Sequence, residues 1–162
     1  MATQASGPNT PILSGKTVGE KRLTFQALLA NELDAPYTLA AFEEFLRVRE
    51  HSEENLEFLN AIKAYRATGG PWDSAEAKAA VATIVQTYVN PGSPKEVNCP
   101  NIVRKKLLED VQAAGMTDPD VFTAAENKTL ELMRLSSFPH FVRWIEGKAN
   151  SPQDRVQGAG AQ

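Results

Sequence analysis

Apolar residues recur along this chain at the spacing of one face of an α-helix. Between residues 38 and 67 they follow an i, i+3, i+4, i+7 pattern on either side of a polar join; they are Phe42, Phe45, Leu46, Phe58, Ile62 and Tyr65. Side chains at this spacing meet on one side of a helix. The pattern therefore predicts two amphipathic helices, over 38–50 and 52–67.

The same period returns in the other parts of the chain. The further helices that it predicts lie at about 24–31, 74–88, 101–114, 119–135 and 137–147. No stretch alternates convincingly with the period of two that marks a half-buried strand. The chain is therefore predicted to be all-α, with seven or more helices in one domain.

Polar residues mark where several of these helices begin. Ser52 is a good N-cap for the helix over 52–67, and Asp73 stands where a capping box has serine or threonine. Asp118 followed by proline has the order of an N-cap and a first helical residue. Ser136 or Ser137 is expected to cap the last helix. These side chains would satisfy backbone N–H groups that lack partners in a first turn.

The segment between the helices at 74–88 and 101–114 is irregular. Residues 90–94 are a cluster of Asn, Pro, Gly and Ser, which is typical of turns. Residues 95–100 are too broken for a helix interior, so we expect a loop with Val97 as its internal side chain. Asn98 follows Val97, and turn chemistry alone would be enough to account for an asparagine there.

The two ends of the chain differ from its middle. Residues 1–20 are rich in Ser, Thr, Gly and Pro, which favours disorder, and residues 148–162 become polar and Gly-rich. The predicted organisation is a disordered segment over 1–20, a helical domain over 21–147 and a flexible tail over 148–162. No apolar run reaches the roughly 20 residues that a membrane-spanning helix needs.

Composition and charge argue against several classes of function. The net charge is −3 and the pI is near 5.5, whereas dedicated nucleic-acid binders usually carry a basic face. Cys99 is the single cysteine, so no intrachain disulfide can form and a reducing compartment fits. With that cysteine, His51 and His140 make no familiar zinc site unless carboxylates join them. We therefore expect a cytoplasmic protein with no metal or other cofactor.

Three separated segments carry a family resemblance. They are Phe42-x-x-Phe45-Leu46 with Ser52-Glu53-Glu54-Asn55-Leu56-Glu57-Phe58, then Glu96-Val97-Asn98, then Leu132-Met133 with Ser137-Phe138-Pro139-His140-Phe141. In this order they resemble the motifs F-x-x-F-L, S-E-E-N-φ-x-F, E-V-N and L-M-x-x-D-S-Y-x-R-F of regulator of G-protein signalling (RGS) domains. The resemblance covers about 24–146. It implies an RGS-like bundle of about seven to nine helices in two packed subdomains.

The resemblance also implies a function. RGS domains accelerate GTP hydrolysis without covalent chemistry of their own, by binding the switch regions of GTP-bound or transition-state α subunits of heterotrimeric G proteins. The chain would act as a monomer, without nucleic acid, and the partner or segments outside this chain would provide any link to the inner face of the plasma membrane. The residues that the motifs assign to α-subunit binding are Glu50, Ser52, Glu54, Asn55, Asn98, Leu132, Ser136, Ser137 and His140.

The resemblance gives Asn98 the central role. In the family, the loop asparagine reaches the switch region beside the catalytic glutamine, and an amide can donate and accept a hydrogen bond at once. Asn55 and Glu54 would bind the switch backbone and support the asparagine loop. Glu50 and Ser52 would contact the same switch.

The third motif departs from the family pattern. Ser136 stands at the position of the family's aspartate, and His140 stands at the position of its arginine. Loss of a charge-assisted hydrogen bond would cost about 1.5–3 kcal/mol of binding. The segment between Leu46 and Ser52 is also one residue longer than usual, which rotates Glu50 relative to the preceding helix.

Two other interpretations stay open on sequence grounds. With its third motif weakened, the chain could be an RGS-like binding or scaffold domain with weak or no GTPase acceleration. It could also be a carboxylate-based hydrolase that uses Glu50 and Glu54, which are four residues apart. An acid–base pair would need a cleft and separated pKa values as well. The carboxylates of this segment could equally form a solvated helix face.

Overall fold

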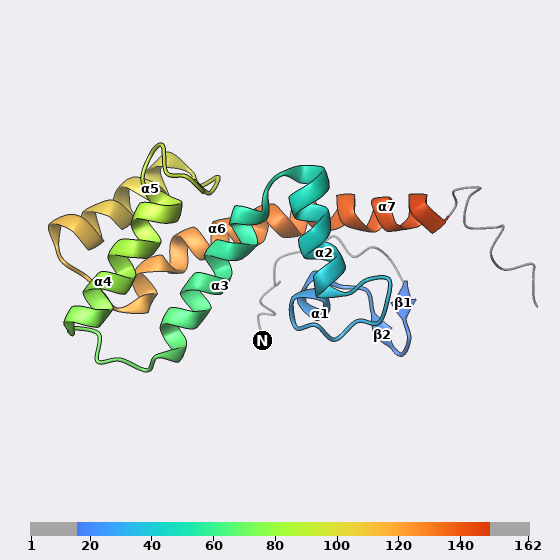
Figure 1. Ribbon diagram of the computed structural model, residues 1–162, viewed down its shortest axis with the longest axis horizontal. Helices are drawn as coiled ribbons and strands as arrows, with labels where there is room; N and C mark the ends of the chain where they lie inside the picture. The colour runs from blue at the N-terminus through green and yellow to red at the C-terminus, as the bar shows by residue number, and fades with distance from the viewer. Residues whose placement is uncertain (1–15, 150–162) are drawn as a thin grey trace, which may run out of the picture. The chain divides into compact units, whose positions relative to one another are not determined.

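The computed structural model describes residues 16–149, and residues 1–15 and 150–162 lie outside the described part. Between 16 and 149 the chain is mainly helical (Figure 1), which confirms the all-α prediction. The helices are α1 (Phe25–Leu29), α2 (Leu39–Phe45), α3 (Glu53–Ala67), α4 (Ala75–Ile84), α5 (Asn101–Leu108), α6 (Thr123–Leu132) and α7 (Phe138–Ala149). None of these helices is long and apolar enough to cross a membrane.

Short helical turns extend several of these helices. π-Helical turns follow α2, α4, α5 and α6; they are η1 (Leu46–Glu50), η2 (Val85–Val89), η3 (Glu109–Ala113) and η5 (Met133–Ser137). A 3₁₀ turn, η4 (Pro119–Phe122), precedes α6. The helix predicted over 38–50 is therefore α2 continued by η1.

The chain divides into two compact units. The first unit contains the chain up to Phe42 and from Phe138 onward, and half of its buried side chains among the described residues are aromatic. The ring centroids of Phe42 and Phe141 lie 5.2 Å apart, and those of Phe25 and Phe138 lie 5.8 Å apart. Edge-on and tilted ring pairs of this kind stabilise a small core beyond the area that they bury.

The first unit also contains a hairpin that the apolar pattern did not predict. Strands β1 (Thr17–Val18) and β2 (Lys21–Arg22) pair antiparallel. Gly19 turns the chain between them with φ +62°, a conformation that favours glycine. Residues 16–20 belong to the segment predicted to be disordered, so the folded part begins earlier than predicted. The remainder of that segment, and the predicted tail beyond Ala149, lie outside the described residues.

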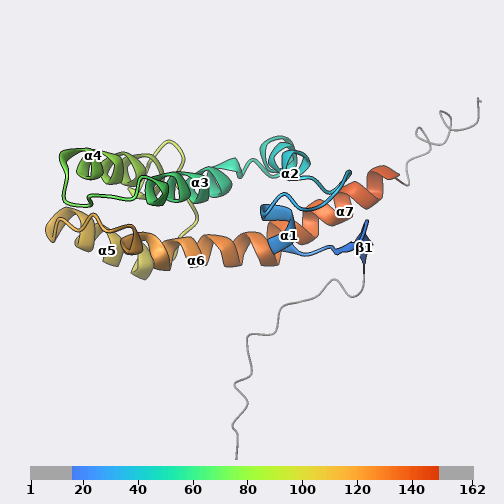
Figure 2. The same cartoon turned by 90° about the horizontal axis from the view of Figure 1, so that it is seen from below.

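The second unit, Glu43–Ser137, consists of two helical layers. Figure 2 shows α3 and α4 in one layer and α5 and α6 in the other. The core includes Phe58, Ile62 and Phe122, each 0% exposed. The rings of Phe58 and Phe122 meet almost at right angles, with centroids 6.5 Å apart. The apolar stripe predicted for 52–67 therefore faces the core.

Two helix starts in the second unit use side-chain caps. Asp118 accepts a hydrogen bond from Asp120 N at 2.9 Å and begins η4, as predicted. The cap of α4 is Ser74, whose Oγ accepts from Ala77 N at 3.0 Å. The prediction of Asp73 as this cap was therefore wrong by one residue. Adjacent polar residues can both serve as caps, and only the backbone conformation selects between them.

The prediction of a helix start at Ser136 or Ser137 was also wrong. Helical structure continues without a break from Thr123 to Ala149, because serine is a weak helix former but does not stop a helix. Within this continuous helical segment Thr129 is 0% exposed. The hydroxyl of Thr129 donates to the backbone oxygen four residues earlier, which satisfies it within the helix.

Candidate functional site

The first candidate segment lies where η1 ends and α3 begins. His51 closes η1 in the left-handed conformation, φ 53°, with its N–H bonded to Leu46 O. The i→i+5 bonds of a π-turn use more residues per turn than an α-helix does, which is how the one-residue insertion expected before Ser52 would be accommodated. Ser52 is the N-cap residue of α3, but its side chain makes no cap bond. Its hydroxyl donates instead to Glu50 Oε2 at 3.2 Å.

Asn55 is a buried polar residue in the first turn of α3. Its side chain is 4% exposed, and its Nδ2 donates to Ser52 O and Glu54 Oε1, both at 3.2 Å. Its Oδ1 is buried and accepts no hydrogen bond from any residue that the structure describes. An unsatisfied buried acceptor costs about 1–3 kcal/mol. Asn55 therefore leaves an unsatisfied hydrogen-bond acceptor at the start of α3.

Three carboxylates crowd the same helix start. Burial raises the pKa of Glu54 above its ordinary value, and the charges of Glu53 and Glu57 raise this pKa further. The positive end of the helix dipole favours carboxylates in this position. Carboxylate groups are thus concentrated beside Asn55, where their oxygens suit a partner that presents N–H donors.

The second candidate segment is the loop between η2 and α5, which holds Asn98 out to solvent. Asn98 is exposed, whereas its neighbours Val97 and Cys99 are 1% and 5% exposed. Val97 N donates to Tyr88 O at 2.9 Å. Because both flanking side chains are buried and the backbone before Asn98 is bonded, the amide is presented from a fixed backbone. The prediction of Val97 as an internal side chain is confirmed.

Arg104, in the first turn of α5, braces this loop. Its guanidinium donates to Val97 O at 3.1 Å and pairs with Glu96 Oε1 at 2.5 Å. Glu96 in turn accepts from Gly92 N at 2.8 Å. Sequence reasoning missed Arg104 because its partners lie in an irregular loop with no periodicity. The available signal was a cation in a first helical turn, where the helix dipole disfavours it.

Replacing Arg104 with glutamine is expected to loosen the asparagine loop. The Arg104 side chain is 13% exposed, so the variant should lose about 1.5–3 kcal/mol of unfolding free energy. Urea denaturation would measure this loss, and hydrogen exchange of the 95–98 amides should become faster. Lys105→Gln is the matched control, because the Lys105 side chain is 76% exposed and its loss should cost under about 0.5 kcal/mol. Equal losses of unfolding free energy in both variants would contradict the claim that Arg104 holds the loop.

Two contacts attach this loop and the η2 turn before it to α3. Lys95 Nζ pairs with Glu57 Oε2 at 2.6 Å, and the rings of Tyr88 and Phe58 pack with centroids 5.7 Å apart. The ion pair is partly exposed and should contribute at most about 1 kcal/mol. The ring contact belongs to the core, so it carries most of the attachment. The fold thereby brings the first and second motifs together.

The third motif lies at the end of α6 and in η5. Leu132 and Ser136 are partly exposed, whereas Ser137 is 5% exposed. These three residues share one helical segment of the second unit with the fully buried Met133. His140 is exposed on α7 and belongs to the first unit, so the structure does not place it in one unit with the other candidates.

The side chains gathered here suit binding to a peptide backbone. Amide, hydroxyl and carboxylate groups supply donors and acceptors side by side. Glu50 accepts from Ser52 and Glu54 accepts from Asn55, so both carboxylates of the hydrolase alternative take part in local structure. Among residues 16–149, no group of three or more His, Cys, Asp and Glu side chains is placed to hold a metal ion.

Comparisons with known proteins identify the family. The model of the regulator of G protein signaling domain matches residues 25–144. The chain is 30% identical over 136 residues to Regulator of G-protein signaling 5 of Sus scrofa, an alignment that covers 84% of this chain and 71% of that protein. It is 32% identical over 120 residues to Regulator of G-protein signaling 8 of Homo sapiens, covering 74% and 61%.

A third relative is Regulator of G-protein signaling 1 of Xenopus laevis. It is 34% identical over 108 residues, covering 64% of this chain and 48% of that protein. The family match includes all three motifs that carry the resemblance and spans most of the described residues. The chain therefore belongs to the RGS domain family, whose members regulate G-protein signalling.

Proposed function

We propose that this chain accelerates GTP hydrolysis by the α subunit of a heterotrimeric G protein. The observation that carries the proposal is the presentation of Asn98. Its amide is exposed between two buried neighbours, on a loop that Lys95 attaches to α3 directly. The same loop is bonded to Tyr88 of η2, whose ring packs on Phe58 of α3. Family membership supports the class of partner, since the named relatives are regulators of G-protein signalling.

In this proposal the chain performs no bond-breaking step. The α subunit carries the arginine and the glutamine that act on the γ-phosphate and the attacking water. A regulator raises the rate if it binds the switch segments more tightly in the transition state than in the ground state. Asn98 would donate to one switch group and accept from another, which holds the catalytic glutamine in its reactive orientation.

The helix start would bind the switch backbone beside Asn98. The buried Asn55 Oδ1 lacks a donor among the described residues, and a switch N–H is the proposed donor once the complex forms. Relief of this unmet bond would contribute to binding, because an unsatisfied buried acceptor is costly. Glu54, Glu50 and Ser52 would accept and donate at the edge of the same contact.

The direct test is single-turnover GTP hydrolysis by a panel of purified α subunits, with and without the full chain. The proposal predicts a faster rate constant for at least one α subunit, rising to saturation with the concentration of the chain. Binding to the aluminium fluoride form of an α subunit without acceleration would favour the scaffold alternative. If the chain neither accelerates hydrolysis by any α subunit nor binds any α subunit, both the proposed function and the scaffold alternative are refuted.

The scaffold alternative rests on the third motif, and restoring that motif separates the two functions. The double variant Ser136→Asp with His140→Arg should lower the concentration of chain needed for half-maximal acceleration by about ten- to a hundredfold. The added carboxylate would accept charge-assisted hydrogen bonds from the switch. Ser136→Asn with His140→Arg is the control, because it adds a similar volume without charge. No difference between the two double variants would contradict the role assigned to position 136.

A further inference from the structure

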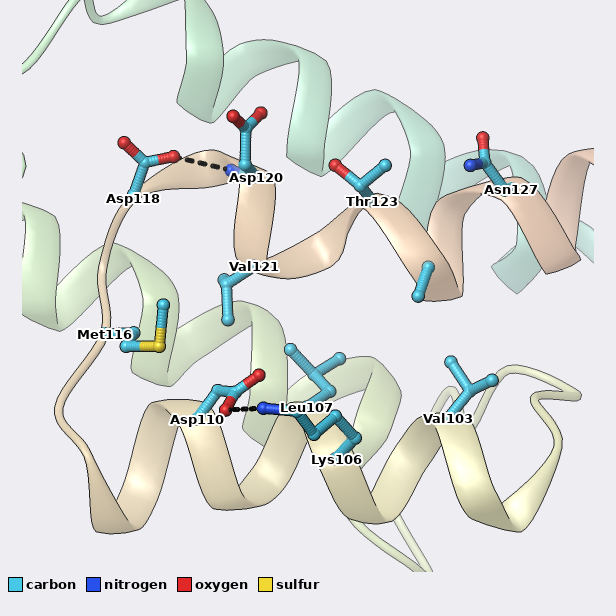
Figure 3. A pocket seen from close by; sticks show the side chains of 11 residues that line it. Val103, Lys106, Leu107, Asp110, Met116, Asp118, Asp120, Val121, Thr123 and Asn127 are labelled. Carbon is cyan, nitrogen blue, oxygen red and sulfur yellow. Dashed lines mark hydrogen bonds and ion pairs between the residues drawn. The ribbon is translucent and has the colours of Figure 1, made fainter.

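A groove outside the candidate site separates two helical segments of the second unit. It runs between α5 with η3 and η4 with α6, and its volume is about 670 Å³ (Figure 3). Val103 and Leu107 line it from one side, and Val121 and Ala124 line it from the other. Met116, 44% exposed, lies at one end. A slot of this size and apolar lining is within the range of protein binding sites.

The rim of the groove carries an excess of negative charge. Asp118 and Asp120 stand at the η4 end, are both exposed, and make no ion pair with any residue between 16 and 149. A third carboxylate, Asp110, is already paired with Lys106. Two carboxylates without an ion pair among the described residues therefore stand beside an apolar slot.

Arg66 lies within electrostatic range of Asp120, but its ion pair is with Glu126. Its guanidinium is held by both carboxylate oxygens of Glu126, at 2.8 and 2.7 Å. A bidentate pair of this kind fixes the orientation of the guanidinium plane. The charges of Asp118 and Asp120 thus remain available to cations from outside the described chain.

We propose that this groove docks an amphipathic helical segment of a partner protein, with apolar side chains on one face and lysine or arginine beside them. A helix that lays its apolar face into a groove is a recurrent mode of peptide recognition. The apolar floor and the acidic end match the two parts of such a segment. Met116 suits the contact as well, because a flexible thioether adapts to differently shaped side chains.

The chain's own terminal segments lack this chemistry. Residues 1–15 contain no lysine or arginine, and residues 150–162 contain one arginine next to one aspartate. Neither segment can offer a cluster of cations to Asp118 and Asp120. Charge complementarity therefore favours a separate protein as the occupant, and the proposal does not depend on activity toward an α subunit.

The test uses the full chain, ¹⁵N-labelled, and a synthetic helical peptide of about 14 residues, roughly four turns. The peptide carries leucine at i, i+3, i+4 and i+7 and lysine elsewhere. Binding should shift the NMR signals of Met116, Val121 and Ala124. Asp118→Asn with Asp120→Asn should weaken binding by about three- to tenfold, while asparagine keeps the cap at 118. Ala124→Arg, which fills the slot, should abolish binding.

The matched control is Glu43→Gln with Glu44→Gln, which removes the same charge at two exposed residues of α2 that do not line the groove. Equal weakening by the control would mean unspecific charge attraction and would overturn the proposal. Equal binding of a peptide with glutamate in place of lysine would overturn it too. Groove signals that change on dilution of the free chain, or in Arg155→Gln, would assign the groove to a second copy or to the C-terminal segment instead.

Discussion

Asn98→Ala is expected to lower the acceleration of α-subunit GTP hydrolysis by at least about a hundredfold at a subsaturating concentration of the chain. Removal of one preorganised hydrogen-bonding group that acts on a transition state typically costs about 2.7–4 kcal/mol. The expected loss is of this size because Asn98 is the one exposed side chain between two buried ones on a braced loop. Single-turnover hydrolysis with the parent chain and the variant measures the effect.

The loss must arise from the missing amide rather than from a damaged fold. Asn98 is exposed, so the variant should unfold within about 0.5 kcal/mol of the parent chain. Asn101→Ala is a matched control, because Asn101 is also an exposed asparagine and lies three positions further along, at the start of α5. Undiminished acceleration by Asn98→Ala, or an equal loss of acceleration in Asn101→Ala, would contradict the proposed role of the Asn98 amide.

Phe58→Ala is expected to have the largest effect on stability, a loss of about 3–5 kcal/mol. Phe58 is 0% exposed, and its ring packs against those of Tyr88 and Phe122. The substitution removes a large side chain from the second unit's core and leaves a cavity between its layers. Urea denaturation would measure the loss as a lower transition midpoint at a similar slope.

Phe58 also links the two motifs, which gives the variant a second expected effect. Its ring joins α3 to Tyr88, and the backbone oxygen of Tyr88 holds the Asn98 loop. Hydrogen exchange at Val97 N should therefore become faster even where the variant remains folded. Leu135→Ala, at a side chain that is 49% exposed, should change stability by less than about 0.5 kcal/mol. A loss below about 1 kcal/mol in Phe58→Ala would contradict this description of the core.

The helical elements could be predicted where one face of a helix is buried. Phe58, Ile62 and Tyr65 were expected to face inward, and they are 0%, 0% and 4% exposed. Burial of a helical stripe follows from its period, because apolar side chains on one face can leave water together, which lowers the free energy of the folded chain. The β1–β2 hairpin has no such stripe. It depends on backbone pairing and on Gly19, which an apolar pattern does not reveal.

The candidate site could be predicted only in part, for a related reason. The motifs led to the proposal of Asn98, but nothing local indicated Arg104, because its bonds to Glu96 and Val97 form only when the loop folds. Ser137 was expected to bind a partner, yet it is 5% exposed. A motif proposes which residues belong to a site. The exposure of each residue depends on helix phase and on packing with segments distant in sequence.

The affinity of the chain for one α subunit in two states tests the central claim most directly. Titration would give the dissociation constant of the chain for two forms of the α subunit. One form carries GDP and aluminium fluoride, which resembles the hydrolysis transition state, and the other carries GDP alone. If the chain acts by stabilising the transition state, it should bind the aluminium fluoride form at least about a hundredfold more tightly than the form with GDP alone. Equal affinity for the two states across a panel of α subunits would contradict the account.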